Sequence, residues 1–550
     1  MTTHSQRASH KTLVAGVLIA VMFLEIMVTP LGTSTPAASS PAVNVNFSSF
    51  QRFTARANND FNPRIFQSSD GRAWFFWETA PIATPWLQDI HYKVYNWTAW
   101  STEQVAVSSP GQKIQNVEPS VAQLTNGTLF LSFASNRTGN FDIYLKRYNP
   151  STGWSSDYQV TTNLASDVVS ALVAASDGSL WVFWDRQTST TTNLYYKTYR
   201  SGTWSVETAL TSDSSPVQDQ RPAAFQTKDG RIWVVWSQVQ DSKFSNIHIV
   251  YKTFNGSTWS SIVQVSFASD TDAHPAGMQD SNGTVWLSWA RDVSYTCPGG
   301  GCAQLDIFYV TSTNNGASWS TEVNLTNDVG CSDPNCFDDD HPSLAELRDG
   351  KIWLFWFTNR DPESWWNLYY VNSSQLPIHN VAVTKVTSSP VKLRGGGTVT
   401  VNVTVANLGT YGETFELDVW ATNKTTVNIV SRGVYLDPSG SFTLSFTWIT
   451  PSSLIGPAPG KYTISASIPA VTNEYFTWDN NATGNKVWVL PPGDVNMDGT
   501  DNVSDLGTVA LAYHSTPGSP NWNPQADLNG EGSVGIDDLS IVALWYHTVT

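Results

Sequence analysis

The stretch Asp229-Gly230-Arg231-Ile232-Trp233-Val234-Val235-Trp236 joins a two-residue turn signal to a short aromatic strand. Asp-Gly and Asn-Gly are strong hairpin signals when apolar runs flank them. The same combination returns along the chain at Asp70-Gly71, Asn126-Gly127, Asp177-Gly178, Asn282-Gly283 and Asp349-Gly350. Successive turns are 51 to 67 residues apart. A period near fifty residues, with four strand-like runs per unit, predicts a β-propeller.

The second unit shows the four runs most plainly. We expect strands over 120–124, 128–133, 142–148 and 154–161, with the Asn126-Gly127 turn joining the first two. The second strand of the other five units carries a pair of tryptophans: Trp74 and Trp77, Trp181 and Trp184, Trp233 and Trp236, Trp286 and Trp289, and Trp353 and Trp356. Residues three apart in a strand face opposite sides, and a propeller blade is covered on both. We interpret these tryptophans as core packing and not as sugar platforms.

The ends of the repeat region predict how the ring closes. The sixth unit stops after Tyr370, without the final Trp-Ser strand of the other units. A matching segment, 48–54, precedes the first unit. We therefore expect the N-terminal strand to complete the last blade and residues 44–377 to form a closed, six-bladed propeller.

Ser312-Thr313-Asn314-Asn315-Gly316-Ala317-Ser318-Trp319 resembles the Asp-box of sialidase-like propellers, with Asn in place of Asp. Shorter copies lie at 202–205 and 256–260. The resemblance implies a sialidase-type fold, but Asp-boxes form turns and do not specify an activity.

Sialidases need an arginine triad, a Tyr/Glu nucleophile pair and an Asp acid. Asn62-Pro63-Arg64-Ile65 lies near the place of the first arginine, in a different residue order, and the other parts have no match, so we do not expect true sialidase activity.

One polar position repeats in every unit, and others break the repeat. The repeating position holds Asp60, Asn116, Asp167, Asp219, Asp272 and Asp339. We expect these side chains to tie loop backbone to its neighbour. The residues that break the repeat are better ligand-binding candidates, and we select Glu118, Arg221, His274, His341, Arg291 and Arg360.

Histidines, tryptophans and carboxylates suggest what this end of the propeller binds. His274 and His341, with Asp272 and Asp340, could hold a cation or transfer protons; satisfied loop histidines are the alternative. Trp86, Trp365 and Trp366 could stack on sugar rings or cap blade edges. A glycoside hydrolase would need two carboxylates at a working distance, drawn from Glu118, Asp185, Asp292 and Asp361.

Two further modules follow. Residues 378–490 alternate apolar and polar residues, as in Thr398-Val399-Thr400-Val401-Asn402-Val403-Thr404-Val405. Together with Val405-Ala406-Asn407-Leu408-Gly409-Thr410 and Trp478-Asp479-Asn480-Asn481, this resembles a CARDB-like β-sandwich, a module that usually serves as a spacer.

The segment 493–550 carries two calcium-loop patterns in register, 33 residues apart. The first places its ligands at Asp494, Asn496, Asp498, Thr500, Asn502 and Asp505, and the second at Asp527, Asn529, Glu531, Ser533 and Asp538. Helices are expected over 505–514 and 538–547. The duplicated loops with Asp at the last position resemble a dockerin, which implies Ca²⁺ as cofactor and a cohesin-type domain as partner. Glu531 and Gly535 depart from the pattern, so we expect weaker calcium binding in the second loop.

The N-terminus and the cysteines predict export. Arg7 and Lys11 precede an apolar run at 13–24 and a small-residue stretch at 33–40, which is the order of a signal peptide within 1–40; a retained anchor is the alternative. Four cysteines form two closely spaced pairs, Cys297 with Cys302 and Cys331 with Cys336, which favours two disulfides of open connectivity over a zinc site. Sequons such as Asn96-Trp97-Thr98 fit a secreted glycoprotein.

Bulk composition narrows the partners. The net charge is −16, from 30 basic and 46 acidic residues, and no Lys/Arg stripe is visible. This disfavours nucleic acid and, beyond the N-terminal segment, membrane as partners. We therefore expect a mainly β, secreted or cell-surface protein that binds glycans or surface ligands through its propeller. Two alternatives stay open: a carbohydrate-active glycoside hydrolase or lyase in polysaccharide breakdown, and a protein-interaction scaffold.

Overall fold

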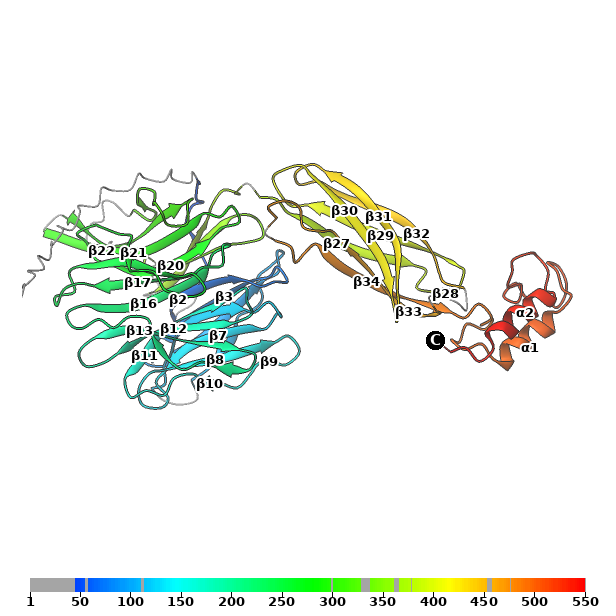
Figure 1. Cartoon of the computed structure of the whole chain (residues 1–550), viewed down its shortest axis with the longest axis horizontal. Helices are drawn as coiled ribbons and strands as arrows, with labels where there is room; N and C mark the ends of the chain where they lie inside the picture. Colours follow the sequence, from blue (N-terminus) through cyan, green and yellow to red (C-terminus); the bar gives the residue numbers. More distant parts are fainter. Residues whose placement is uncertain are drawn as a thin grey trace, which may run out of the picture. The chain divides into compact units, whose positions relative to one another are not determined.

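The computed structural model describes residues 45–54, 58–109, 113–297, 300–327, 337–360, 366–376, 378–452, 458–474 and 476–549, with the side chains of 295–303 left out. The protein is mainly β (Figure 1). No helix among the described residues is long and apolar enough to cross a membrane.

Two predictions fall outside this description. One is the signal peptide within 1–40. The other is the pair of disulfides, because the side chains of Cys297 and Cys302 and the whole of Cys331 and Cys336 are not among the described parts of the chain. The structure therefore neither supports nor contradicts disulfides at these four cysteines, and both assignments stay predictions.

Six antiparallel sheets of four or five strands follow one another in the N-terminal part of the described chain. The first three are β2 (Asn58–Gln67), β3 (Ala73–Pro81), β4 (Asp89–Tyr95) and β5 (Gln104–Val107); β6 (Asn116–Gln123), β7 (Leu129–Ser135), β8 (Asp142–Asn149), β9 (Gly153–Trp154) and β10 (Tyr158–Gln159); and β11 (Ser166–Ala174), β12 (Leu180–Gln187), β13 (Thr192–Arg200), β14 (Thr203–Trp204) and β15 (Thr208–Ala209). The last three are β16 (Gln218–Gln226), β17 (Ile232–Val239), β18 (Ile247–Phe254) and β19 (Val263–Gln264); β20 (Asp272–Gln279), β21 (Val285–Cys297), β22 (Gly300–Ser312) and β23 (Val323–Asn324); and β24 (Asp339–Glu346), β25 (Ile352–Thr358), β26 (Asn367–Asn372) and β1 (Gln51–Arg52).

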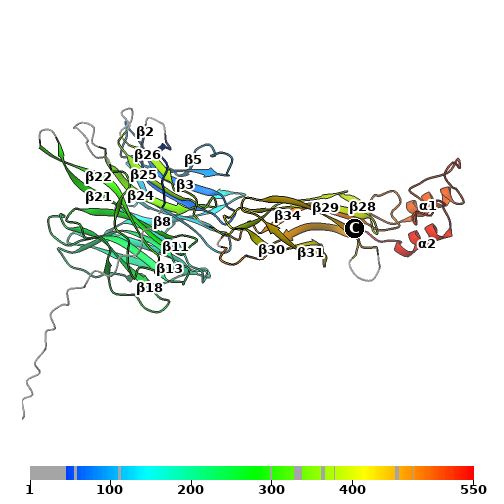
Figure 2. The same ribbon diagram turned by 90° about the horizontal axis from the view of Figure 1, so that it is seen from above.

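The sheets close into a ring, which is the arrangement of a β-propeller. Their innermost strands, β2, β6, β11, β16, β20 and β24, each contact the next, and β24 contacts β2. Strand β1 pairs with β26, with Gln51 opposite Tyr370. The expected completion of the last sheet by the N-terminal strand is therefore confirmed. Strands β21 and β22 extend beyond their neighbours (Figures 1 and 2).

The strand tryptophans fill the spaces between sheets, as the sequence predicted. Eight of the ten are buried, and Trp181 and Trp353 are half-buried. At the repeating polar position, Asn116 donates to the loop carbonyl of Gln88 in the preceding sheet at 3.3 Å, as predicted. Several of the repeating carboxylates bind side chains of their own sheet. Asp219, Asp272 and Asp339 accept the indole N–H of Trp236, Trp289 and Trp356 at 2.6 to 2.8 Å. A buried indole N–H needs an acceptor, and in these three sheets the second tryptophan of the pair finds it in this carboxylate. In the third sheet the carboxylate of Asp167 binds the Arg186 guanidinium instead.

A β-sandwich follows the propeller. One sheet contains β27 (Val381–Ser389), β29 (Thr398–Asn407) and β32 (Ser441–Ile449); the other contains β28 (Lys392–Arg394), β34 (Asn481–Leu490), β33 (Gly460–Ser467), β30 (Glu413–Thr422) and β31 (Thr426–Leu436). The valines at 399, 401, 403 and 405 of β29 are fully buried, whereas the alternating residues are less so. The two-residue alternation in the sequence reflects this single buried face.

The C-terminal part contains two helices, α1 (Val503–Ala512) and α2 (Ile536–Trp545). Each begins two residues earlier than predicted, because the last residue of each loop already belongs to the first helical turn. In α1 the Asn502 side chain accepts the Ser504 N–H at 2.8 Å, and the Asp505 carboxylate accepts the Asn502 N–H at 2.9 Å. This reciprocal pair is a capping box. Val495, Val509, Ala526, Val534 and Val542 form a small buried core.

Candidate functional site

The six innermost strands each contain a β-bulge at the same place. In five of them the residue before the bulge proline has a left-handed backbone, with φ of 48° to 59°, at Asn62, Glu118, Arg221, His274 and His341. Val169 holds this place in the third sheet. A left-handed backbone is unfavourable for such residues and is often found at functional sites. We call these six residues the axial ring.

Buried carboxylates hold the bulges in place. Asp185 accepts the backbone N–H of Val169 at 3.1 Å and that of Arg221, in the next sheet, at 3.0 Å. Glu78 holds the equivalent position in the first sheet, where it accepts the N–H of Glu118 and, at 2.6 Å, the side-chain N–H of Asn62. Asp185 was named from the sequence only as a candidate carboxylate for hydrolysis, and Glu78 was not named, although a carboxylate at this point of an apolar strand was a visible signal.

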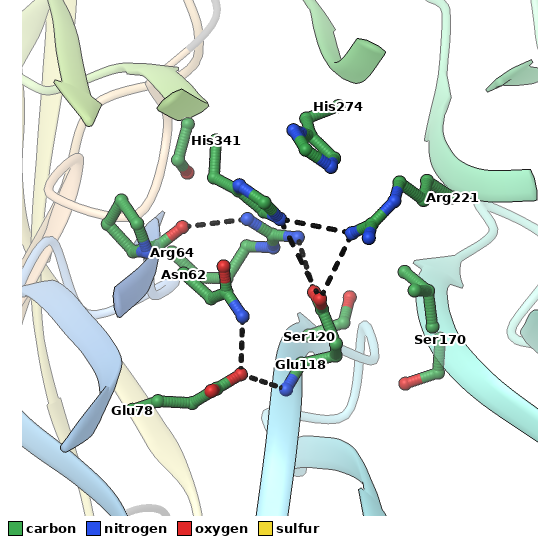
Figure 3. A network of polar contacts seen from close by, with 12 residues as sticks. Asn62, Arg64, Glu78, Glu118, Ser120, Ser170, Arg221, His274 and His341 are labelled. Carbon is green, nitrogen blue, oxygen red and sulfur yellow. Dashed lines mark hydrogen bonds and ion pairs between the residues drawn. The ribbon is translucent and has the colours of Figure 1, made fainter. Parts of the chain in front are cut away.

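The structure brings four of the nine ligand-binding candidates, Glu118, Arg221, His274 and His341, together in this ring. The Glu118 carboxylate lies 3.7 Å from Arg64 Nη2, 3.6 Å from Arg221 Nη1 and 3.8 Å from His341 Nε2 (Figure 3). Arg221 Nη1 is also 3.2 Å from His341 Nε2. The buried Glu118 carboxylate therefore contacts three cationic or polar side chains from three different sheets.

The two histidines stack on one another and share one carboxylate. Their ring centroids are 3.5 Å apart. Asp340 Oδ1 lies 2.5 Å from His274 Nδ1, and Oδ2 lies 3.2 Å from His341 Nδ1. The three side chains offer ligand atoms within 4.8 Å of one another, a spacing that a metal ion could use. Asp272 does not join them, because it is bound to Trp289 and Arg291.

Burial and neighbouring charge shift the pKa values of these groups in opposite directions. Burial, reinforced by the charge of Glu118, raises the pKa of Glu78 to about 7. Burial acts against ionisation of Glu118 too, but His341, Arg221 and Arg64 outweigh it and lower its pKa to about 2. Burial lowers the pKa of His274 to about 3. At pH 6 the axial ring therefore combines an ionised Glu118 and a neutral His274, and the supporting Glu78 is protonated.

The ring encloses little space. The opening among Arg64, Glu118, Arg221, His274 and His341 measures about 10 Å³, and the channel beneath it about 120 Å³. The first volume holds no more than a water molecule. A larger ligand must therefore rest over the ring, where the Arg221 and Arg64 side chains are 37% and 23% exposed.

The remaining candidates lie elsewhere or at the border. Arg291 binds Asp272 and Glu322, and Arg360 binds Asp339, so both guanidinium groups join strands of their own sheets. Trp366 packs on the rings of Phe61 and Phe357, and Phe357 in turn stacks on His341. Trp86 is 48% exposed. Trp365 lies outside the described residues.

The two loops before α1 and α2 have matching internal geometry. Asp494 accepts the N–H groups of Asp498 and Gly499, and Asp527 accepts those of Glu531 and Gly532, with equal distances of 3.1 and 2.8 Å in both loops. Asp494, Asp505 and Asp538 are fully buried. Burial, with Asp505 and Asp498 nearby, raises the pKa of Asp494. Buried carboxylates that repel one another suit a divalent cation bound by oxygen ligands. In the second loop the Glu531 carboxylate accepts the Ser533 hydroxyl at 2.8 Å.

No protein-family model and no curated protein matches the sequence. Among solved structures, the chain is similar to a protein of unknown function from Dyadobacter fermentans, with 12% identity and a TM-score of 0.47 over 60% of this chain and 99% of that one. It is similar to a Hadza microbial sialidase, with 12% identity and a TM-score of 0.43 over 58% and 66%. It is also similar to an α-L-arabinanase of Penicillium chrysogenum in complex with arabinobiose, with 14% identity and a TM-score of 0.42 over 58% and 93%. At such low similarity these likenesses carry no argument about activity, and the propeller assignment rests on the sheets themselves.

Proposed function

We propose that this is a secreted modular protein whose six sheets are the blades of a sialidase-like propeller that binds a glycan over the axial ring. One observation carries the proposal: five ring positions with a left-handed backbone place polar side chains at one end of the channel. The propeller does not need polar residues there, because Val169 holds the same place in the third sheet. Exposed guanidinium groups above a fixed carboxylate can donate several hydrogen bonds to sugar hydroxyl or carboxylate groups.

The test is a glycan array probed with the full chain in calcium buffer. Wild type should bind a defined set of glycans, and Arg221→Asn should lose at least 10-fold in binding, since Asn already occupies the equivalent position 62. Arg200→Asn is the matched control, because Arg200 is 64% exposed and pairs with Asp177 beside a turn. Equal loss in both variants, or no binding by wild type, would contradict the proposal and leave the protein-interaction scaffold.

Glycoside hydrolysis is the second candidate, and the opposed pKa shifts of Glu78 and Glu118 support it. Glycosidases combine a protonated and an ionised carboxyl group whose environments separate their pKa values. We rank it below binding because Glu78 is only 2% exposed and is held by Asn62 and the Glu118 backbone. Release of reducing sugar from a bound glycan, abolished in Glu118→Gln, would place hydrolysis first.

We further propose that residues 378–490 are a CARDB-like spacer and that 493–550 form a dockerin-like module that binds Ca²⁺ and a cohesin-type partner. The matched loops, with buried Asp494, Asp505 and Asp538, support this. Calorimetry on the full chain should detect two sites, with the second weaker because Gly535 offers no side-chain ligand and Glu531 binds Ser533. Asp494→Ala should remove the tighter site, and binding to a panel of recombinant cohesins should disappear with EDTA.

Export of the chain is a separate proposal with its own tests. N-terminal sequencing of the secreted chain tests cleavage within 1–40. Peptide mass spectrometry of the unreduced protein tests whether Cys297, Cys302, Cys331 and Cys336 form two disulfides, and it also reads their connectivity. Four free thiols in the secreted protein would contradict the disulfide prediction.

A further inference from the structure

A second candidate site lies between the second and third sheets, away from the axial ring. Elsewhere, a tryptophan at the start of the outer strand packs on two aromatic rings of the preceding sheet. Trp259 lies 6.3 and 5.9 Å from the rings of Trp181 and Tyr196, and Trp319 lies 6.3 and 6.1 Å from those of Trp233 and Tyr251. These contacts fill the space between neighbouring sheets.

The second sheet lacks both the receiving tryptophan and the receiving tyrosine. Phe130 stands where the other five units carry tryptophan. Leu145 stands where the other five carry tyrosine, and it pairs with Ser132 in the register that those tyrosines share. The tryptophan of the third sheet, Trp204, instead stacks on Tyr158 at 5.9 Å with an interplanar angle of 4°, and contacts Tyr199 at 5.1 Å.

A groove lies beside these two smaller side chains. It has a volume of about 330 Å³, and its lining includes Phe130, Leu145, Tyr199 and Trp204. Tyr158 at its edge is 52% exposed. Ser155, Ser156, Asp157 and Arg147 add hydroxyl, carboxylate and guanidinium groups to the rim. The volume falls in the range of small-ligand pockets.

We propose that this inter-sheet groove binds one or two sugar rings of a glycan chain, independently of the axial ring. A pyranose presents apolar C–H faces and a rim of hydroxyl groups, and the groove presents aromatic faces with polar groups around them. The volume suits a ligand of one or two rings better than an extended peptide. An aromatic-lined groove can also receive a proline-rich peptide, so the experiment must separate the two ligands.

The decisive variant fills the groove instead of weakening the fold. Phe130→Trp with Leu145→Tyr restores the residues that the other units carry, so the full chain should unfold at the same or a higher temperature. On a glycan array this double variant should bind the groove-dependent glycans at least 10-fold more weakly than wild type. Arg221→Asn should still bind those same glycans. Trp204→Ala should give the same loss as the double variant.

Three outcomes would overturn the inference. The first is a filled variant with the array profile of wild type. The second is that Arg221→Asn loses binding to every glycan that wild type binds. That result would assign all glycan binding to the axial ring and none to the groove. The third is binding of a polyproline peptide to wild type that the filled variant loses while its glycan profile stays unchanged, which would assign the groove to a peptide.

Discussion

The two ends of the propeller sheets follow different rules. At the turn end the sequence repeats from unit to unit, and its polar groups serve local structure: Asp229 accepts the Thr227 hydroxyl and the Arg231 guanidinium beside Gly230. At the bulge end the ring positions differ from sheet to sheet, and Glu118 reaches across sheets toward Arg64, Arg221 and His341. Repeated positions such as Asp229 maintain the fold, whereas the ring positions differ between sheets, and this difference is why we place the proposed ligand site there.

The largest expected effect comes from a repeated position. Asp272→Ala would leave the Trp289 indole N–H without its acceptor and remove one of the two carboxylates that bind the buried Arg291 guanidinium. We expect the propeller transition to lose about 3 kcal/mol in free energy of unfolding, the lower end for breaking a buried ion pair. Denaturant unfolding followed by tryptophan fluorescence measures it. A loss no larger than that of Arg221→Asn would erase the distinction between the two kinds of position.

The pH dependence of stability should report on Glu78. Its pKa is about 7 in the folded protein against an ordinary value of 4.5, so the folded state binds the extra proton between these values. Stability from this group is present below pH 4.5 and is lost as the pH rises toward 7. Glu78→Gln should therefore be more stable than wild type at pH 8, by on the order of 2 kcal/mol, with little difference at pH 5. Parallel pH profiles for the two proteins would refute the assignment.

A smaller effect is expected where the two proposed calcium loops differ. Asp501 is fully buried, and neither carboxylate oxygen has a hydrogen-bond partner among the described residues. Val534 holds the equivalent place in the second loop. Asp501→Val should stabilise the module by about 1–2 kcal/mol, because it removes an unsatisfied polar group. Thermal unfolding in calcium measures this, with Val534→Asp as the converse control. Loss of calcium affinity in Asp501→Val would instead make Asp501 a contributor to the site.

The smallest effect is expected at the exposed edge of the ring. Arg221→Asn should change propeller stability by less than about 0.5 kcal/mol, because the substituted side chain is partly exposed and the backbone N–H bonded to Asp185 remains. Denaturant unfolding beside Asp272→Ala measures both variants on one scale. A loss above about 2 kcal/mol would show that the ring residue supports the fold.

The sequence predicted the sheets and ring closure because turn signals and strand alternation are local and repeat six times. It also selected Glu118, Arg221, His274 and His341, because a repeat makes exceptions visible. Asp340 was named with His274 and His341, but Glu78 escaped assignment to this network, since its role depends on contacts between sheets. Arg291 and Arg360 were selected for breaking a repeat, yet their partners are the repeated aspartates. The groove beside Trp204 could not be predicted from the sequence, because it depends on which rings meet across neighbouring sheets.

The most direct test replaces Arg221 and His274 together by Asn, the residue that the first unit carries at position 62. Thermal unfolding and glycan-array binding would be measured on the same preparation of the full chain, beside wild type. The account predicts an unfolding temperature within a few degrees of wild type and loss of the glycans that depend on the axial ring. A strongly lowered unfolding temperature, or an unchanged array profile, would contradict the claim that the ring residues are present for a ligand.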